Sequence, residues 1–260
     1  MKFSRKKLGI PYAVFMILFV VLPLLVVLYY AFTNGQGQFT LENFQGFFQS
    51  RRTLGTLFYS VVIAFVTTFF CLLIAYPTAY ILARGNIKHG ALLLVLLVLP
   101  MWINFTLRIT ALKEILSYIE GNLAFYPFFN TIFCMVYDFL PFMILPLYTT
   151  ISKLDKQMPE AAADLGADRR QIFFKVILPL TMPGIISGIT MVFLPAMTNY
   201  VVLDMVYNST YIMGSLIGSY FNAYDWHNGS MISIVLLVII FGVTALTSQG
   251  FKKDEKIGGY

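Results

Sequence analysis

The sequence predicts an all-α integral membrane protein with six transmembrane helices, and three observations support this prediction. Of the 260 residues, 58% are hydrophobic and only 12% are charged, with a mean hydropathy of +0.77, whereas a soluble domain has about 25% charged residues. Six apolar stretches have about the 20 residues that are needed to cross a hydrocarbon core. The basic residues gather in alternate connections between these stretches. Residues 1–260 therefore form one expected transmembrane domain.

The six expected spans are residues 10–32, 56–83, 91–112, 128–150, 182–204 and 230–249. Each contains Pro, Gly or both, which membrane helices tolerate when neighbouring groups satisfy the freed backbone. The first span is too long for the apolar core of a signal peptide and has no small-residue cleavage site after it, so we expect it to remain in the protein. The segment 33–55 is rich in Gly, Gln and Asn and then in aromatic residues, which predicts a helix lying along the outer surface.

The distribution of positive charge predicts the orientation. With both termini in the cytoplasm, the outer connections hold only four of the 18 Lys and Arg residues, which are Arg51, Arg52, Arg108 and Lys113. The cytoplasmic side then has the excess of positive charge that is usual for membrane proteins. This orientation places the polar connection 151–180 in the cytoplasm.

The connection 151–180 has the features of a short helix that a partner could grip. Pro159 suits the first position of a helix, and the three alanines that follow favour helix formation. Gly166 can end this helix in a left-handed cap, about 10 Å further on. Asp168 and Gln171 have the spacing of a capping box for a second helix. We expect the first helix to be held away from the membrane domain by a stiff arm that Pro179 closes.

Two carboxylates and three aromatic residues in the spans are candidates for contact with a cargo. Asp138 lies roughly 15 Å deep in span four, so it must face an aqueous path, pair with a cation or be protonated. Asp204 lies at the outer end of span five, where it could receive a cation arriving from outside. Trp102, Tyr137 and Tyr200 could add cation–π attraction, although single aromatic residues in membrane helices usually serve packing.

The remaining polar residues exclude several chemistries. The sequence has no G-x-x-x-x-G-K-[ST] motif, so it does not bind ATP by that loop. The two histidines lie in loops on opposite sides, which leaves no His-based triad or intramembrane zinc site. Cys71 and Cys134 fall inside apolar spans, where packing is their expected role. Arg108 is expected to extend to the outer interface, with Glu114 as a local partner. We expect no catalytic residue, no metal ligand and no nucleic-acid partner.

The connection 151–180 resembles the EAA loop of ABC-importer permeases. The matching positions are Glu160, Ala161, Ala162, Gly166, Val176, Leu178 and Pro179, of which only Val176 departs from the more usual Ile. Segments around Trp102, Pro141, Pro179 and Met197 extend the resemblance to nearly the whole chain, and there it is closest to the PotB-type permeases of spermidine/putrescine importers. Two features depart from this pattern. Asp138 stands where these permeases tend to have Asn or an apolar residue, and the outer connection between spans three and four is short.

The resemblance implies a type I ABC-importer permease fold in a bacterial plasma membrane. It also implies a complex with a second, PotC-like permease subunit, a cytoplasmic ATPase dimer and an extracytoplasmic polyamine-binding protein, surrounded by membrane lipids. ATP would bind to the ATPase, and this chain would hold no cofactor. The residues expected to contact the ATPase are Glu160, Ala161, Ala162, Gly166, Leu178 and Pro179. Closure of the ATPase dimer would turn the pathway outward by alternating access, and the pathway would use Asp204, Asp138, Trp102, Tyr137 and Tyr200.

Three alternatives remain open. The cargo could be another solute, such as an amino acid, a metal complex or an oxyanion, although an oxyanion would favour cations or helix N-termini over two carboxylates. A secondary transporter could use Asp138 as a proton carrier, but the sequence shows no internal repeat of the kind many such folds have. A structural scaffold is the third alternative. For a polyamine cargo, Asp204→Asn should reduce uptake more than Asp138→Asn, because the second change restores a residue that the resembling permeases tend to carry.

Overall fold

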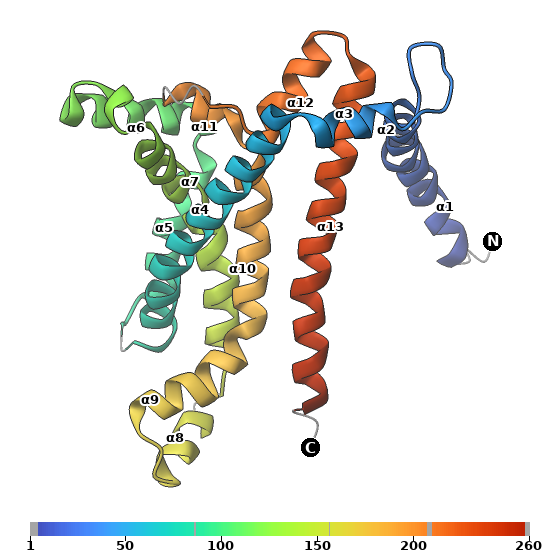
Figure 1. Ribbon diagram of the computed structural model, residues 1–260. Coiled ribbons are helices and arrows are strands. Elements are labelled where there is room, and N and C mark those ends of the chain that lie inside the picture. Colours follow the sequence, from blue (N-terminus) through green and yellow to red (C-terminus); the bar gives the residue numbers. More distant parts are fainter. Residues whose placement is uncertain (1–4, 86, 156, 207–209, 258–260) are drawn as a thin grey trace.

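The computed structural model describes the backbone of residues 5–85, 87–155, 157–206 and 210–257, and the side chains of residues 10–245 within these ranges. The described part of the chain is helical, apart from one isolated antiparallel bridge between Thr33 and Phe39 (Figure 1). The elements in chain order are α1 (Arg5–Met16), η1 (Ile17–Val21), α2 (Leu22–Ala31), α3 (Glu42–Gln49), α4 (Arg51–Arg84), α5 (Gly90–Val98), η2 (Leu99–Trp102), α6 (Phe105–Glu120), η3 (Leu123–Phe125), α7 (Pro127–Ser152), α8 (Gln157–Asp164), α9 (Arg169–Ile172), η4 (Phe173–Ile177), α10 (Leu178–Thr198), α11 (Tyr200–Met205), α12 (Met213–Asn222) and α13 (Trp226–Ile257).

Within the described residues, five helical stretches are long and apolar enough to cross a membrane, and a sixth is present if one bent pair counts as a span. The five are Ile10–Ala31, Arg51–Arg84, Pro127–Ser152, Arg169–Thr198 and Trp226–Ala245. The bent pair consists of α5 with η2 and of α6. The expectation of an all-helical membrane protein is confirmed, with five or six candidate spans.

The expected third span, residues 91–112, is not one straight helix. The axes of its two parts meet at 97°, because the chain becomes extended at Ile103 and a new helix starts at Asn104. The Asn104 side chain accepts hydrogen bonds from the backbone N–H groups of Thr106 (2.9 Å) and Leu107 (3.4 Å). Asn in this capping position favours a helix start even inside an apolar stretch. As a result, α6 lies across one end of the long helices (Figure 1).

The expected fifth span, residues 182–204, has other limits in the structure. The helix runs without a break from Arg169 to Thr198. It ends before Asn199, where the backbone leaves helical geometry, and α11 follows as a separate short helix. The C-terminal part of the expected span, including Asp204, is therefore displaced from the long helix.

Pro179 does not close a rigid arm, which corrects the expectation from the sequence. A proline lacks the N–H group that a helix uses and crowds the carbonyl four residues before it. The turn before Pro179 is a wide π-turn, η4, in which the Leu178 N–H reaches back to the Phe173 carbonyl. A π-turn of this kind accommodates the proline without ending the helix. The first span has the same arrangement, with η1 ahead of Pro23.

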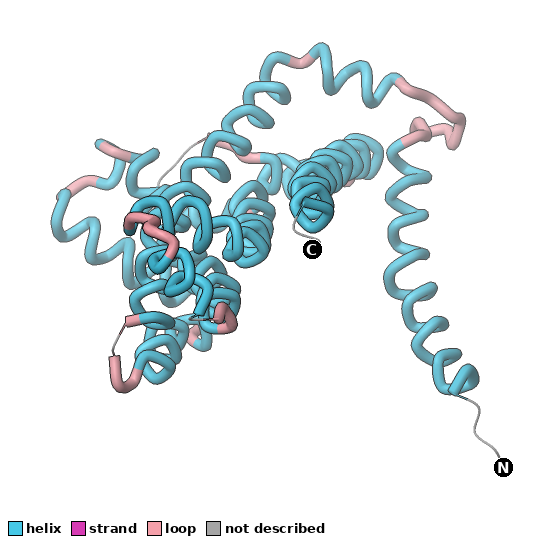
Figure 2. The backbone as a smooth tube through the Cα atoms, turned by 90° about the horizontal axis from the view of Figure 1, so that it is seen from below, coloured by secondary structure: helices cyan, strands magenta, loops and turns pink. Residues whose placement is uncertain are grey.

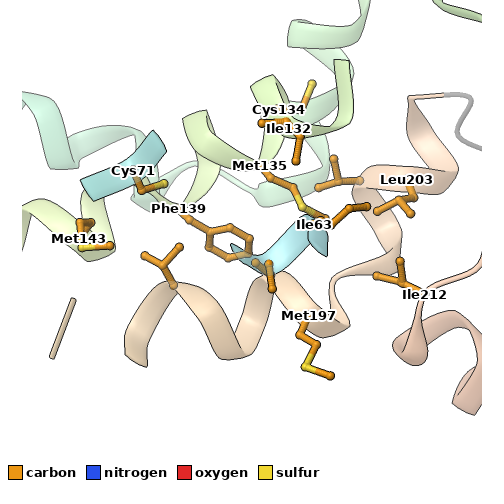
Figure 3. Packing of buried hydrophobic residues seen from close by; sticks show 14 of the residues in the cluster. Ile63, Cys71, Ile132, Cys134, Met135, Phe139, Met143, Met197, Leu203 and Ile212 are labelled. Carbon is orange, nitrogen blue, oxygen red and sulfur yellow. The ribbon is translucent and has the colours of Figure 1, made fainter. Parts of the chain in front are cut away.

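The centre of the fold is the mutual packing of α4, α7 and α10. The buried face of α4 consists mostly of small residues, among them Ala64, Cys71, Ala75 and Ala79, all with no exposed surface. On α10, a Cβ added to Gly188 would lie 2.5 Å from the Met143 sulfur of α7. Small residues therefore allow these helices to approach closely, as in other membrane proteins. Figure 3 shows the core, in which Cys71 and Cys134 are buried and unpaired, as expected.

The other helices surround this core at its ends and on one side. The first span stands apart from the core helices (Figure 2) and packs through α2 against α13. The amphipathic helix α3 falls within the segment expected to lie along a surface, and it buries Phe47. In Figure 1, α3, α6, α11 and α12 lie at one end of the long helices, and α8 and α9 lie at the other. The two expected functional regions are therefore at opposite ends of the molecule.

Candidate functional site

The helix expected around Glu160 is present as α8, but it begins two residues earlier than the sequence suggested. Its first residue is Gln157 rather than Pro159. The Asp155 side chain explains the earlier start, because its Oδ1 accepts a hydrogen bond from the Gln157 backbone N–H at 3.0 Å. Aspartate favours helix starts for this reason. Glu160 lies in the first turn of α8, where a carboxylate interacts favourably with the helix dipole.

Gly166 ends α8 in the conformation that the sequence predicted. Its φ angle is +87°, in the left-handed region that favours glycine. Its N–H donates to the Ala163 carbonyl (2.9 Å), and the Ala167 N–H donates to the Ala162 carbonyl (3.0 Å). These two bonds form a Schellman motif, which satisfies carbonyl groups at the end of a helix.

The capping box that begins the second helix is also confirmed. The Asp168 Oδ1 accepts from the Gln171 N–H at 2.6 Å, and the Gln171 Oε1 accepts from the Asp168 N–H at 3.3 Å. We call residues 157–172, which contain α8 and α9, the α8–α9 hairpin. Both ends of its turn are thus fixed by local hydrogen bonds.

The α8–α9 hairpin exposes apolar side chains at both ends of α8. Leu165 is 89% exposed and Met158 is 53% exposed, while Glu160 and Ala161 are exposed and Ala162 is half-buried. The hairpin lies beyond the ends of the long helices (Figure 1), and α8 packs against α9 and η4. A helix of defined shape that carries exposed apolar side chains is suited to docking on another protein.

The last two residues of the expected coupling loop belong to the long helix. Leu178 is half-buried against the core, and Pro179 is exposed in the first turn of α10. They connect the hairpin to α10 through continuous helix rather than through a separate arm. The hairpin and α10 are thus joined without a break in the helix.

Asp138 is buried near the middle of α7 and is paired with Arg108. The Arg108 Nη2 lies 2.6 Å from the Asp138 Oδ1, and the two side chains are 8% and 5% exposed. Arg108 comes from α6 and Asp138 from α7, so the pair joins the helix after the 97° bend to the core. The expectation that Arg108 extends to the interface beside Glu114 is wrong. The 97° bend places α6 across α7, whereas the sequence predicted one straight helix for residues 91–112.

The hydrogen bonding of this ion pair is incomplete. The Nε and Nη1 of Arg108 have no hydrogen-bond partner among the described residues, whereas the Asp138 Oδ1 contacts the Nη2 of Arg108. Burying two charges is costly, and their mutual attraction offsets that cost only when the remaining donors and acceptors are also satisfied. The sequence did contain a signal for this pair, because Arg108 and Asp138 are opposite charges in two consecutive apolar stretches.

The other expected pathway residues are more exposed than Asp138 and come from three different elements, η2, α7 and α11. Asp204 is exposed on α11, which packs against α6 and α7. Tyr200, the first residue of α11, is 41% exposed, and Tyr137 is 40% exposed. Trp102 is 90% exposed in η2 and lines a wholly apolar pocket of about 380 Å³ with Leu145 and residues of α5. Among the described residues, no hydrogen bond or ion pair joins these aromatic residues to either carboxylate.

Comparisons with known proteins give consistent matches over most of the chain. A family model described as "Binding-protein-dependent transport system inner membrane component" matches residues 3–251. The spermidine/putrescine transport system permease protein PotB of Haemophilus influenzae is 38% identical over 262 residues, covering 92% of this chain and 91% of that protein. PotB of Escherichia coli K12 is 37% identical over 252 residues, covering 86% of this chain and 90% of that protein. A PotB homolog of Mycoplasma pneumoniae is 30% identical over 247 residues, covering 86% of this chain and 83% of that protein.

Two solved structures have the same fold. One is a chain of a bacterial alginate ABC transporter in complex with an alginate pentasaccharide-bound periplasmic protein, with a TM-score of 0.73 and 13% identity, covering 93% of this chain and 91% of that one. The other is a chain of a bacterial ABC transporter involved in alginate import, with a TM-score of 0.70 and 15% identity, covering 98% of this chain and 96% of that one. At these identities the likeness concerns the fold alone.

Proposed function

Because the chain belongs to the family of inner membrane components of binding-protein-dependent transport systems, we propose that it is the transmembrane subunit of an ATP-driven importer that carries spermidine and putrescine into the cell. The observation that carries this proposal is the 38% identity to a spermidine/putrescine permease over 92% of the chain. The family and the candidate spans make the chain a multi-pass protein of a bacterial plasma membrane.

In the proposed orientation, both termini and the α8–α9 hairpin are in the cytoplasm. Arg169, Arg170 and Lys175 follow α8 along the chain, and such clusters of positive charge favour the cytoplasmic side. The elements α3, α6, α11 and α12 then face outward. This arrangement places the ATPase and the binding protein at opposite ends of the molecule.

The cytoplasmic partner is an ATPase dimer, and the α8–α9 hairpin is the part of this chain that it grips. Glu160, Met158 and Leu165 supply an acidic and apolar contact surface on a helix whose ends are fixed by hydrogen bonds. The sequence has no phosphate-binding loop, so ATP binds to the partner. Closure of the ATPase dimer moves α8, and the continuous helix from α9 through α10 passes this movement into the membrane.

The outward end faces the other partners. An extracytoplasmic binding protein delivers the polyamine, and a second, PotC-like permease completes the pathway by alternating access. A polyamine carries at least two positive charges, and carboxylates offset the hydration that it loses in the passage. Asp204, exposed on α11, is the carboxylate placed to receive it.

The buried ion pair weakens the two main competing hypotheses. A secondary transporter with Asp138 as proton carrier needs a carboxylate that exchanges protons with water, whereas Asp138 is 3% exposed and faces a guanidinium group. For an oxyanion cargo, the pathway would need a free cation. Among the residues that the structure describes, Arg108 is the only basic one buried in the spans, and its charge is already matched by Asp138. The first observation argues against proton-coupled transport through Asp138, and the second argues against an anionic cargo.

The proposal is tested in proteoliposomes that contain this chain together with its partner permease and ATPase, with the binding protein added outside. We expect uptake of labelled spermidine and putrescine only when ATP is enclosed with the ATPase. Glu160→Lys combined with Gly166→Val should abolish this uptake. The double variant Glu114→Lys with Gly121→Val serves as the matched control, because it reverses an exposed acidic charge and replaces a glycine of positive φ at the end of α6. Absence of polyamine uptake by the wild type, with uptake of another solute, would reject the cargo but keep the importer class.

A further inference from the structure

We propose that Arg84 is a positioning residue that ties the start of the α8–α9 hairpin to α4, so that movement of the hairpin is carried along α4 to the outer face. This inference rests on the proposed function, because it takes α8 to be the element that an ATPase moves. It assigns a role to a helix that is separated from the hairpin along the chain by α5, η2, α6, η3 and α7.

Arg84 is the last residue of α4 and reaches the connection between α7 and α8. Its Nη2 donates a hydrogen bond to the Leu154 carbonyl at 2.7 Å, and the Asp155 carbonyl lies 3.5 Å from the same nitrogen. Asp155 in turn caps α8 by accepting from the Gln157 N–H. One guanidinium group therefore holds the end of α4 on the residues at which α8 begins. Its fixed fork of N–H donors suits adjacent carbonyl groups better than an ammonium group does.

A second attachment joins α4 to the segment that leaves the hairpin. The Tyr76 hydroxyl lies 3.0 Å from the Thr181 hydroxyl in the first turn of α10. The Tyr76 ring also meets the Phe173 ring edge-on, with 5.8 Å between the ring centroids. Phe173 is the first residue of η4. The chain that enters the hairpin and the chain that leaves it are thus both fastened to α4.

The outer end of α4 is fastened in a similar way. The Ser60 hydroxyl oxygen accepts a hydrogen bond from the backbone N–H of Met213 at 2.8 Å, and Met213 is the first residue of α12. The guanidinium carbon of Arg52 lies 5.3 Å from the centre of the Tyr211 ring, which is a cation–π contact. Since α4 has 34 residues, it spans about 51 Å at the rise of an α-helix. It links the hairpin at one end to the segment ahead of α12 at the other.

The first test measures the attachment itself by hydrogen exchange of the full chain in lipid nanodiscs. Arg84→Met keeps much of the aliphatic stem and removes the donors. We expect the amides of Leu154 and Gln157 to exchange about tenfold faster, the lower end of what a hydrogen bond from a charged donor contributes. Lys88→Met, which removes a nearby exposed positive charge, should leave both amides unchanged. Equal exchange rates in Arg84→Met and the wild type would overturn the proposal.

The second test separates coupling from assembly in the complete complex. Spermidine uptake and ATP hydrolysis are measured in the same proteoliposomes. In Arg84→Met we expect the ATP hydrolysed per spermidine to rise by about fivefold, within the range of known coupling changes. Arg84→Lys should give an intermediate value, because its ammonium can still donate to one carbonyl, and Tyr76→Phe should add to the effect of Arg84→Met.

If uptake and hydrolysis fall by the same factor in Arg84→Met, the residue serves only assembly and the proposal is overturned. A wild-type complex that takes up no spermidine would instead reject the proposed function. The exchange experiment would then still decide whether Arg84 holds the hairpin to α4.

Discussion

The ion pair between Arg108 and Asp138 allows a quantitative prediction for Asp138→Asn. We expect the free energy of unfolding to fall by about 3 kcal/mol, the lower end of the range for removing one partner of a buried ion pair. The Arg108 guanidinium would stay buried without a counter-charge, since its side chain is 8% exposed. Its Nε and Nη1 already lack partners among the described residues. The Asn carbonyl oxygen can accept one hydrogen bond, which places the cost at the lower end of the range.

The double variant Arg108→Met with Asp138→Leu should be more stable than Asp138→Asn. It removes both charges together, so no uncompensated charge remains in the low-dielectric interior. The incomplete hydrogen bonding of the pair means that little favourable energy is lost with it. The two residues are in contact, so the effects of the single changes should not add.

The measurement is thermal or denaturant unfolding of the purified protein in detergent, followed by tryptophan fluorescence. Asp204→Asn is the matched control, because the same chemical change at an exposed carboxylate should alter stability by less than about 0.5 kcal/mol. Wild-type stability in Asp138→Asn would show that the pair is not buried in the folded protein. A double variant less stable than either single variant would show that the pair is net stabilising, contrary to what its incomplete hydrogen bonding implies.

Three further predictions concern topology, coupling and cargo. The variant Ser152→Cys should resist an impermeant thiol reagent added outside intact cells, whereas Ala223→Cys should react. The native cysteines should not react, because both are fully buried. The opposite labelling pattern would reverse the orientation. Gly166→Val should lower ATP-driven uptake by about tenfold, because a β-branched residue at a φ of +87° is strained by about 1–3 kcal/mol. Gly166→Asn should retain most of the uptake. Equal loss of uptake in both variants would show that backbone strain is not the cause. Asp204→Asn should lower spermidine uptake and leave basal ATP hydrolysis unchanged, and uptake at the wild-type level would remove Asp204 from the pathway.

The local features of the α8–α9 hairpin could be predicted because short-range rules determine them. The cap at Gly166 and the capping box of Asp168 and Gln171 depend on residues within one turn of each other, and both are present. The start of α8 was misplaced for the same local reason, since Asp155 competes with Pro159 for the first turn. Helix existence followed from hydropathy, which sums over about 20 residues and tolerates local exceptions.

Features that depend on contacts between distant segments could not be predicted in this way. Hydropathy measures composition and does not detect a change of helix direction. Residues 91–112 therefore had the hydropathy profile of one span despite the bend at Asn104. Once α6 turns across the end of α7, Arg108 meets Asp138, 30 positions away in the chain. The attachment of Arg84 to Leu154 joins residues 70 positions apart. Neither contact has a periodic signature in a single sequence.

The ion pair also changes the expected roles of the two carboxylates. From the sequence, Asp138→Asn was expected to be the milder change, because it restores a residue typical of the resembling permeases. With Arg108 beside it, Asp138 is already neutralised and is not free to attract a polyamine. Its removal should therefore harm stability first, whereas Asp204 remains exposed on α11. Because α11 packs against both α6 and α7, a cation that binds at Asp204 would press on the helices that the ion pair holds together. The charge that recognises the cargo would then act from the outer end of the protein, and the charge at Asp138 would keep the bent helix in place to receive it.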